Sequence, residues 1–188
     1  MAASVQSIWR HPIKGFTPEP LDQVSLEVGG RLPFDRLFAV EDGPSGFDPA
    51  APRHIAKQRF TVLAKIPAVA RIRTALDDAT RRLTATAPGH PAFEGDLTDA
   101  VQGEAFAAWL GAVLGDQVSG PLKLLQAPPA HRFMDDDQGY VSIINLASLE
   151  ALAEAMGQPV DPLRLRGNLY VRDWPAWAEA GLAGAAGG

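Results

Sequence analysis

The stretch SIWRHPIKGFTPEPL (residues 7–21) joins a strand-like segment to a turn that carries a cation. Residues 4–10 favour a β-strand, and Pro12 ends that pattern because proline has no backbone N–H to offer a strand. Lys14 and Gly15 follow at once. A lysine at this place is either an ordinary solvated charge or one half of a site for an anion.

Four further segments of the first half are predicted to be short strands. They are apolar or alternating, and Gly, Pro or Asp residues bound them. They cover residues 21–28, 36–42, 69–76 and 81–87. The last two are expected to form a hairpin across Asp77-Asp78, since aspartates favour tight turns. Short strands at this spacing are typical of a small barrel or a strongly bent sheet.

The second half mixes helices with strands. A helix is predicted over residues 99–115 and a second over 145–157, each followed by a glycine cap. Strands are predicted over 121–127 and 163–173. The predicted apolar faces comprise Val101, Phe106, Trp109, Leu110, Val113 and Leu114 in the first helix, and Leu146, Leu149, Leu152 and Met156 in the second. This order of elements indicates an α+β fold.

Composition excludes several classes of function. The chain has 188 residues, 46% of them hydrophobic, which suffices for one core or for two small subdomains. A formal net charge of −5 argues against nucleic-acid binding, which relies on a basic face. The absence of cysteine excludes disulfides, thiolate metal sites and a cysteine nucleophile within these residues. No signal peptide or membrane-length apolar run is found, so a soluble, cytoplasmic protein is expected.

The sequence holds no common catalytic motif, but cations recur at the ends of predicted elements. The aspartates at 135–137 favour a solvated loop over a metal site, because metal-binding loops space their ligands at alternating positions. The cations at element ends are Lys14, Arg36, Lys57, Arg59, Arg164 and Arg166. Asn168 adds a neutral donor and acceptor. Singly, such residues are usually exposed surface charges, but together they fit a multiply charged anion such as phosphate.

Four segments in order resemble the MOSC family, named for the C-terminal domain of molybdenum cofactor sulfurase. The first runs from IWRHPIKGF through PLDQVSLEVGGRLPFDRLFAVED, and the second is HIAKQRFTVLAKI. The third is INLASLEALAEAMGQPVDPLRLRGNLYVRD, and the last is WPAWAEA. The resemblance spans residues 5–180.

This resemblance implies a bent β-barrel and a ligand. It implies an N-terminal MOSC β-barrel subdomain over residues 1–95 and the beginning of an incomplete MOSC domain, truncated at its C-terminus, over 96–188. The implied ligand is the molybdenum cofactor, a molybdopterin with a terminal phosphate, used for oxo- or sulfur-transfer redox chemistry. Family members include amidoxime-reducing enzymes, so an electron-transfer protein is an expected partner. The implied cofactor-binding residues are Lys14, Arg36, Lys57, Ser148, Arg166 and Asn168.

The chain departs from the family pattern at places that bear on catalysis. Gly15 stands where many relatives have serine, and Arg59-Phe60 replaces an acidic residue and a proline. The family's metal-ligating or sulfur-carrying cysteine follows the Arg-x-Asn strand, whereas these 188 residues contain none. Three hypotheses stay open: a redox domain whose cysteine lies beyond residue 188, a non-catalytic module that binds an anion or a partner, and a structural module whose cations form surface salt bridges.

Overall fold

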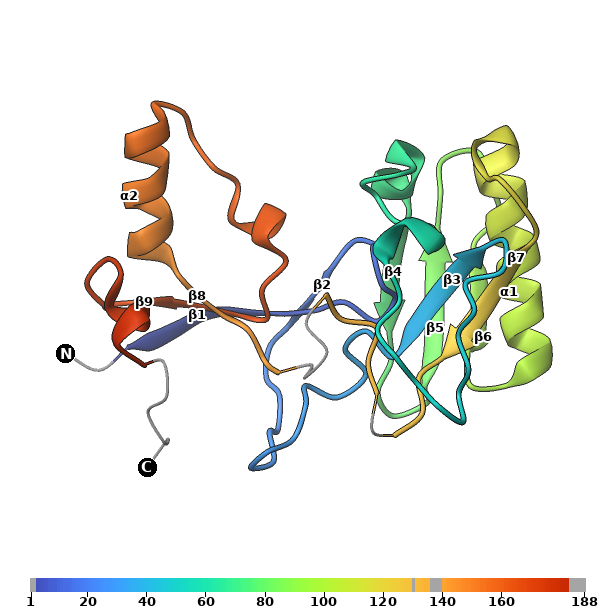
Figure 1. The fold of residues 1–188 in the computed structure, drawn as a ribbon, viewed down its shortest axis with the longest axis horizontal. Helices are drawn as coiled ribbons and strands as arrows, with labels where there is room; N and C mark the ends of the chain where they lie inside the picture. The colour runs from blue at the N-terminus through green and yellow to red at the C-terminus, as the bar shows by residue number, and fades with distance from the viewer. Residues whose placement is uncertain (1–2, 130, 136–139, 183–188) are drawn as a thin grey trace. The chain divides into compact units, whose positions relative to one another are not determined.

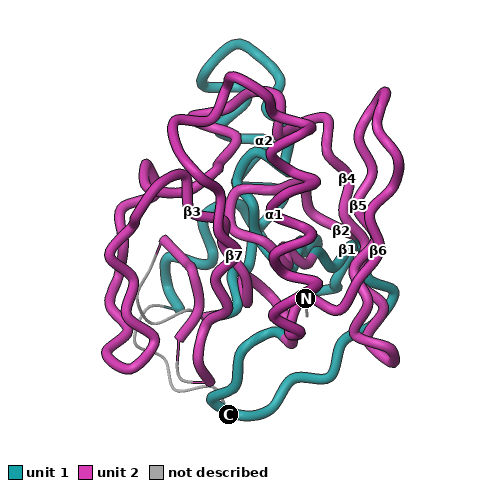
Figure 2. The backbone as a smooth tube through the Cα atoms, turned by 90° about the vertical axis from the view of Figure 1, so that its right-hand side faces the viewer, with its two compact units in different colours: residues 1–9, 20–32, 141–188 teal, residues 10–19, 33–140 magenta. Residues whose placement is uncertain are grey.

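A computed structural model of the chain describes residues 3–129, 131–135 and 140–182, which form nine strands and two α-helices (Figure 1). The chain divides into two compact units, shown in different colours in Figure 2. Unit 1 comprises Met1–Trp9, Pro20–Leu32 and Val141–Gly188, and unit 2 comprises Arg10–Glu19 and Pro33–Tyr140. Each unit is described by itself.

Unit 1 is built on a four-stranded sheet with the order β2-β1-β9-β8. Its strands are β1 Ser4–Arg10, β2 Glu19–Leu21, β8 Ile143–Asn145 and β9 Leu169–Arg172. Strand β9 pairs antiparallel with β1 and parallel with β8. Helix α2 (Leu146–Met156) follows β8 directly; the Asn145 side chain accepts a hydrogen bond from Ala147 N–H, and Gly157 ends the helix in a left-handed conformation.

Unit 2 contains two antiparallel sheets and helix α1 (Ala100–Leu114). Strand β3 (Phe38–Asp42) pairs with β7 (Leu122–Gln126). The second sheet consists of β4 Arg73–Leu76, β5 Arg82–Thr86 and β6 Phe93–Asp96. Helix α1 contacts β6 and β7, and the Asp99 side chain caps its first turn. Short 3-10 helices cover Lys57–Arg59, Pro67–Arg71 and Gly115–Gln117 in unit 2, and Pro162–Leu165 and Ala178–Leu182 in unit 1.

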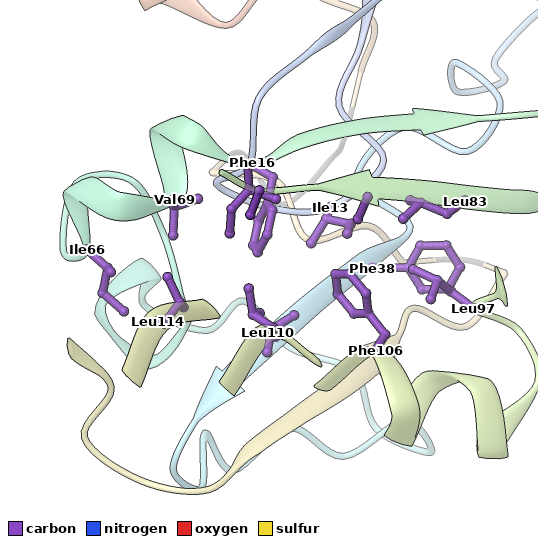
Figure 3. Close-up of a cluster of buried hydrophobic side chains, with 14 of the residues drawn as sticks. Ile13, Phe16, Phe38, Ile66, Val69, Leu83, Leu97, Phe106, Leu110 and Leu114 are labelled. Atoms are coloured by element: carbon purple, nitrogen blue, oxygen red, sulfur yellow. The ribbon is translucent and has the colours of Figure 1, made fainter. Parts of the chain in front are cut away.

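The core of unit 2 fixes the turn that carries Lys14. Ile13 and Phe16, on either side of Lys14-Gly15, are buried in the same cluster as Phe38, Phe106 and the leucines of α1 (Figure 3). Burying two large side chains within four residues stabilises the local backbone, since each contributes on the order of 2 kcal/mol of transfer free energy. The lysine is therefore held on a rigid turn.

The structure confirms the α+β fold, both predicted helices and most of the predicted strands. The strand predicted over 21–28 is wrong, because only Glu19–Leu21 pairs and Leu26 and Val28 are exposed. The segments 69–76 and 163–173 form strands only in their second halves, since each begins in a 3-10 helix started by a proline. Val101 is exposed and does not belong to the buried face of α1.

The expected bent barrel is not closed among the described residues. Closure requires the two edge strands of one sheet to pair. The described strands instead form separate sheets of four, two and three strands. The two units interleave in sequence, and the division at residues 95 and 96 stays a prediction. None of the helices in the described part of the chain has the length and apolarity to cross a bilayer.

Candidate anion-binding site

Hydrogen bonds join the Lys14 turn to the segment that carries Arg36. Both segments belong to unit 2. The Asp35 carboxylate accepts a hydrogen bond from His11 N–H at 2.7 Å, and Arg36 N–H donates to the His11 carbonyl at 2.7 Å. Lys14 N–H donates to the carbonyl of Phe38, two residues after Arg36, at 2.8 Å. These hydrogen bonds hold two predicted cations on adjacent turns, although the two cations are separated by more than twenty residues in sequence.

The ends of the Lys14 segment are held by a buried ion pair. Arg10 Nε donates to Glu19 Oε1 at 2.6 Å, and both side chains are nearly inaccessible to solvent. The other oxygen of Glu19 accepts the backbone N–H of Leu76 at 2.6 Å, and Arg10 donates to the Leu76 carbonyl at 3.0 Å. The segment between residues 10 and 19 is therefore anchored to the end of β4.

Two further segments of unit 2 complete the surroundings of Lys14. Phe133 N–H donates to the Arg36 carbonyl at 3.0 Å, which aligns residues 131–135 with the Arg36 segment. Phe60 forms an isolated bridge with Glu41 of β3, and the 3-10 turn that holds Lys57 lies directly before Phe60. The rings of Phe60 and Phe133 lie 5.7 Å apart, edge to face, and join these two segments in one small core.

Three of the predicted cations of unit 2 lower the pKa of one carboxylate, that of Asp135. The Lys14 ammonium donates to Asp135 Oδ1 at 2.8 Å and to the Phe133 carbonyl at 3.1 Å. The Lys14 hydrogen bond is the main cause that lowers the pKa of Asp135; partial burial opposes it, and the charges of Lys14, Lys57 and Arg36 lower it further. Arg36 also forms an ion pair with Asp35. The cluster of Lys14, Arg36 and Lys57 is called the cation cluster below.

The space beside Lys14 is small and lined by basic and aromatic groups. A cavity of about 10 Å³, enough for roughly one water molecule, is bordered by Lys14, His54, Phe60 and residues 131–134. His131 packs against the rings of Phe47 and Phe133. Arg132 donates to the His131 carbonyl at 2.6 Å. Sequence reasoning assigned no role to His54, His131 or Arg132; the only signal was a basic-aromatic run, HRF, inside a proline-rich loop.

Gly15 has a packing role beside Lys14. Its φ is +82°, and a Cβ there would lie 2.4 Å from Val62 Cγ1. A serine would meet both the strain of that backbone conformation and a steric clash. The glycine that departs from the family pattern is therefore required by how this chain packs residue 62.

The predicted site residues of unit 1 have structural partners of their own. The Asn168 side chain is fully buried; its oxygen accepts Ser142 N–H at 3.1 Å and the Ser142 hydroxyl at 3.0 Å. Its amide nitrogen donates to the Trp9 carbonyl at 3.1 Å. Asn168 thus ties β1 to the segment before β8.

Ser148 and Arg166 also have defined places in unit 1. The Ser148 hydroxyl accepts Trp177 N–H at 2.8 Å and hydrogen-bonds the Glu179 carboxylate. Burial acts to raise the pKa of Glu179, but hydrogen bonds from Ser148 and Asn145 lower it below its ordinary value. Arg166 is half-buried and ends a 3-10 helix with φ of +53°, an uncommon conformation for an arginine.

The structure therefore brings together Lys14, Arg36 and Lys57 in unit 2, whereas Ser148, Arg166 and Asn168 belong to unit 1. Their role in binding a cofactor stays a prediction. Of the three aspartates at 135–137, only Asp135 lies within the described residues. Within residues 3–129, 131–135 and 140–182, no three His, Asp or Glu side chains are grouped closely enough to hold a metal ion.

A comparison with protein-family models finds a match that covers the segments that carry the cation cluster. The family model of the MOSC N-terminal beta barrel domain matches residues 2–117, more than half of the chain. The chain belongs to this family. The matched residues contain the Lys14 turn, the Arg36 segment and the Lys57 turn, and the loop with Asp135 follows them. No curated protein matches the chain significantly.

Proposed function

We propose that the cation cluster of unit 2 binds the phosphate of a molybdenum cofactor. The observation that carries the proposal is that the Lys14 ammonium holds the exposed carboxylate of Asp135 at 2.8 Å, where the charges of Arg36 and Lys57 lower the pKa of that carboxylate further. A carboxylate and a phosphate present the same kind of acceptor to a lysine or arginine. A phosphate monoester, with up to two negative charges, suits three cations better than one carboxylate does.

The residues present fit the phosphate end of such a cofactor. Lys14 is nearly buried and offers its ammonium as a fixed point charge, while Arg36 offers a planar donor group. Lys57 is exposed and adds charge at the edge. When bound, the cofactor would supply the metal-centred redox or oxygen-transfer chemistry, and these residues would hold and neutralise its phosphate.

The sequence offers no thiolate for the metal end, because the 188 residues contain no cysteine. This fact favours a second candidate function, a module that binds an anion without catalysing a reaction. Both candidates use the cation cluster in the same way. They differ in the ligand: the first binds the molybdenum cofactor, and the second binds a pterin phosphate without molybdenum or another anion.

Several finer expectations belong to this proposal. They are the division into a barrel subdomain over 1–95 and a partial MOSC domain over 96–188, and the completion of a bent barrel. Arg166 and Asn168 are proposed as contacts to the pterin, and Ser148 as a further cofactor-binding residue. An electron-transfer protein is the partner proposed for a redox role, and the cytoplasm the proposed compartment. The match to the MOSC N-terminal beta barrel domain over residues 2–117 supports the barrel subdomain, and the other expectations follow from the wider resemblance to the MOSC family.

The first experiment measures anion binding to the full chain by calorimetry, with pyrophosphate as the probe. The native chain is expected to bind it. The Lys14→Ala/Arg36→Ala variant is expected to lose at least tenfold in affinity, since two donors and two charges are removed. Arg164→Ala, an exposed cation at an element end of unit 1, is the control and should leave the affinity unchanged. Equal binding by the native and double-variant chains would refute the site.

A second experiment separates the two candidates. The chain is purified from cells that make the molybdenum cofactor, then denatured, and the released pterin and molybdenum are quantified. Pterin with molybdenum supports the cofactor role, whereas pyrophosphate binding without co-purified pterin supports the simpler anion module. The variant Lys14→Ala/Arg36→Ala, purified in the same way, should carry less pterin than the native chain.

A further inference from the structure

We propose that Asp135 is an internal competitor for the anion, a carboxylate that an incoming phosphate must displace from Lys14. The inference rests on the proposed function of the cation cluster and adds a control on its occupancy. It assigns a role to a residue that sequence reasoning placed in a solvated loop.

The contact between Lys14 and Asp135 is the one that a bound anion would make. The Lys14 Nζ to Asp135 Oδ1 distance is 2.8 Å, an ordinary length for a charge-assisted hydrogen bond. The cavity beside Lys14 is about 10 Å³, too small for a phosphate group. Binding at Lys14 therefore requires that the carboxylate give up its place.

The two partners differ in how firmly they are held. The Lys14 side chain is 7% exposed, whereas that of Asp135 is 77% exposed. Lys14 is fixed by its turn and by the core residues Ile13 and Phe16. An exposed carboxylate gains solvation when it leaves, so its exchange for a phosphate disturbs one ion pair and no core packing.

The chain next to Asp135 is anchored, so the carboxylate returns to Lys14 when the anion leaves. Phe133, two residues earlier, is buried and contacts the rings of Phe47 and Phe60. Its N–H and carbonyl are bound by Arg36 and Lys14 respectively. This tether keeps the Asp135 carboxylate within reach of the cation cluster and at a high effective concentration. The competition is therefore a property of the fold and does not depend on another molecule.

The size of the effect follows from the strength of the internal contact. If a fraction of molecules has Lys14 occupied by Asp135, the apparent affinity for an anion falls in proportion to the fraction that is open. Partly exposed ion pairs of this kind are modest. Removing the competitor should therefore raise the affinity about two- to sixfold.

The test uses the full chain, with pyrophosphate titrated by calorimetry at physiological ionic strength. Asp135→Asn keeps the size of the side chain and removes its charge, and should bind about two- to sixfold more tightly than the native chain. Asp116→Asn removes the same charge from an exposed site after α1 and should change the affinity by less than about 1.5-fold, because salt screens distant charges. Lys14→Ala combined with Asp135→Asn should abolish the gain. A crystal structure with pyrophosphate should show Asp135 and Lys14 beyond hydrogen-bond distance.

The outcomes separate this inference from the proposal beneath it. Equal affinities of the native and Asp135→Asn chains, together with a loss in Lys14→Ala, would keep the anion site and overturn the competitor. A complex in which pyrophosphate binds while Asp135 still contacts Lys14 would overturn it as well. If neither the native chain nor Asp135→Asn binds pyrophosphate, the proposed function itself fails, and the inference that depends on it fails with it.

Discussion

The Lys14 turn of unit 2 and the Asn168 segment of unit 1 both carry polar residues assigned to one site, yet the two segments use them differently. Lys14 holds a carboxylate that is mostly exposed to solvent. Asn168 is buried, and its amide bonds Ser142 and Trp9 within its own sheet. The first arrangement can exchange its partner for a ligand, whereas in the second the amide already holds two segments of unit 1 together.

The largest expected effect comes from breaking the buried arrangement. Asn168→Ala would leave Ser142 N–H, the Ser142 hydroxyl and the Trp9 carbonyl without the amide. Leaving buried polar groups unsatisfied should lower the free energy of unfolding by about 2–4 kcal/mol. Urea denaturation measures this, with the exposed amide of Gln158→Ala as the control, expected within about 0.5 kcal/mol of the native chain.

The affinity for pyrophosphate completes this test. It should stay unchanged in Asn168→Ala under conditions where the variant is folded, because the cation cluster lies in unit 2. A stable Asn168→Ala chain that had lost pyrophosphate binding would reverse the contrast between the two segments.

A second comparison contrasts two carboxylates of unit 2. Asp42 has a fully buried side chain; it forms an ion pair with Lys65 and accepts Ser119 N–H at 2.6 Å and Gly120 N–H at 2.9 Å. Burial acts to raise its pKa, but the Lys65 contact and these backbone bonds lower it below its ordinary value. Asp135 also has a lowered pKa, yet it is mostly exposed. Asp42→Asn should therefore cost about 1–3 kcal/mol at pH 7, and Asp135→Asn less than about 1 kcal/mol.

The pH dependence of the Asp42 effect has a definite sign. The pKa of Asp42 in the folded protein lies below its value in the unfolded chain. Between these two pKa values, the folded protein therefore binds fewer protons than the unfolded chain. The stabilisation by Asp42 is full above about pH 4, the unfolded value, and is lost as the pH falls through the lowered value. The difference in unfolding free energy between the native and Asp42→Asn chains should shrink over that window. A difference that stayed constant down to the acid transition would contradict the assignment.

Sequence reasoning succeeded where the signal is local. The caps Gly115, Asn145 and Gly157 delimit the helices in sequence and in structure alike. It failed for residues 21–28, because alternation of apolar residues does not reveal whether a partner strand exists. Strand β6 (FEGD) was missed because it has a single large apolar residue and no alternation, and β8 (IIN) because it runs directly into helix α2.

The cation cluster was predicted only in part, because only some of its residues have a local signal in the sequence. Lys14 and Arg36 stand at the ends of predicted strands, and the resemblance to the MOSC family implies that both bind the cofactor. Asp135 had no local signal, since its place depends on hydrogen bonds between residues 36–37 and residues 127 and 133, about ninety positions away. The role of Gly15 likewise depends on Val62, which lies far along the chain.

Ser148 sharpens the comparison in unit 1 with a smaller effect. Ser148→Ala removes the acceptor of Trp177 N–H and one hydrogen bond to Glu179, which should lower the free energy of unfolding by about 1 kcal/mol. The pKa of Glu179 should rise, because burial is then opposed by fewer hydrogen bonds. Urea denaturation and a carboxyl NMR titration measure the two changes. Ser148→Thr, which keeps the hydroxyl, should restore both; an unaltered Glu179 titration in Ser148→Ala would refute the structural role.

The smallest expected effect concerns the edge of the cation cluster. Lys57 and Arg59 lie in one exposed 3-10 turn, and the charge of Lys57 is one of the causes that lower the pKa of Asp135. Lys57→Ala should raise that pKa slightly and weaken pyrophosphate binding by no more than about twofold, because exposed charges are screened by solvent and salt. Arg59→Ala removes the same formal charge two residues away and is the matched control. If both substitutions weaken pyrophosphate binding equally, the anion is attracted by net charge alone. If only Lys57→Ala weakens binding, the position of the Lys57 ammonium determines its contribution, as a specific binding site requires.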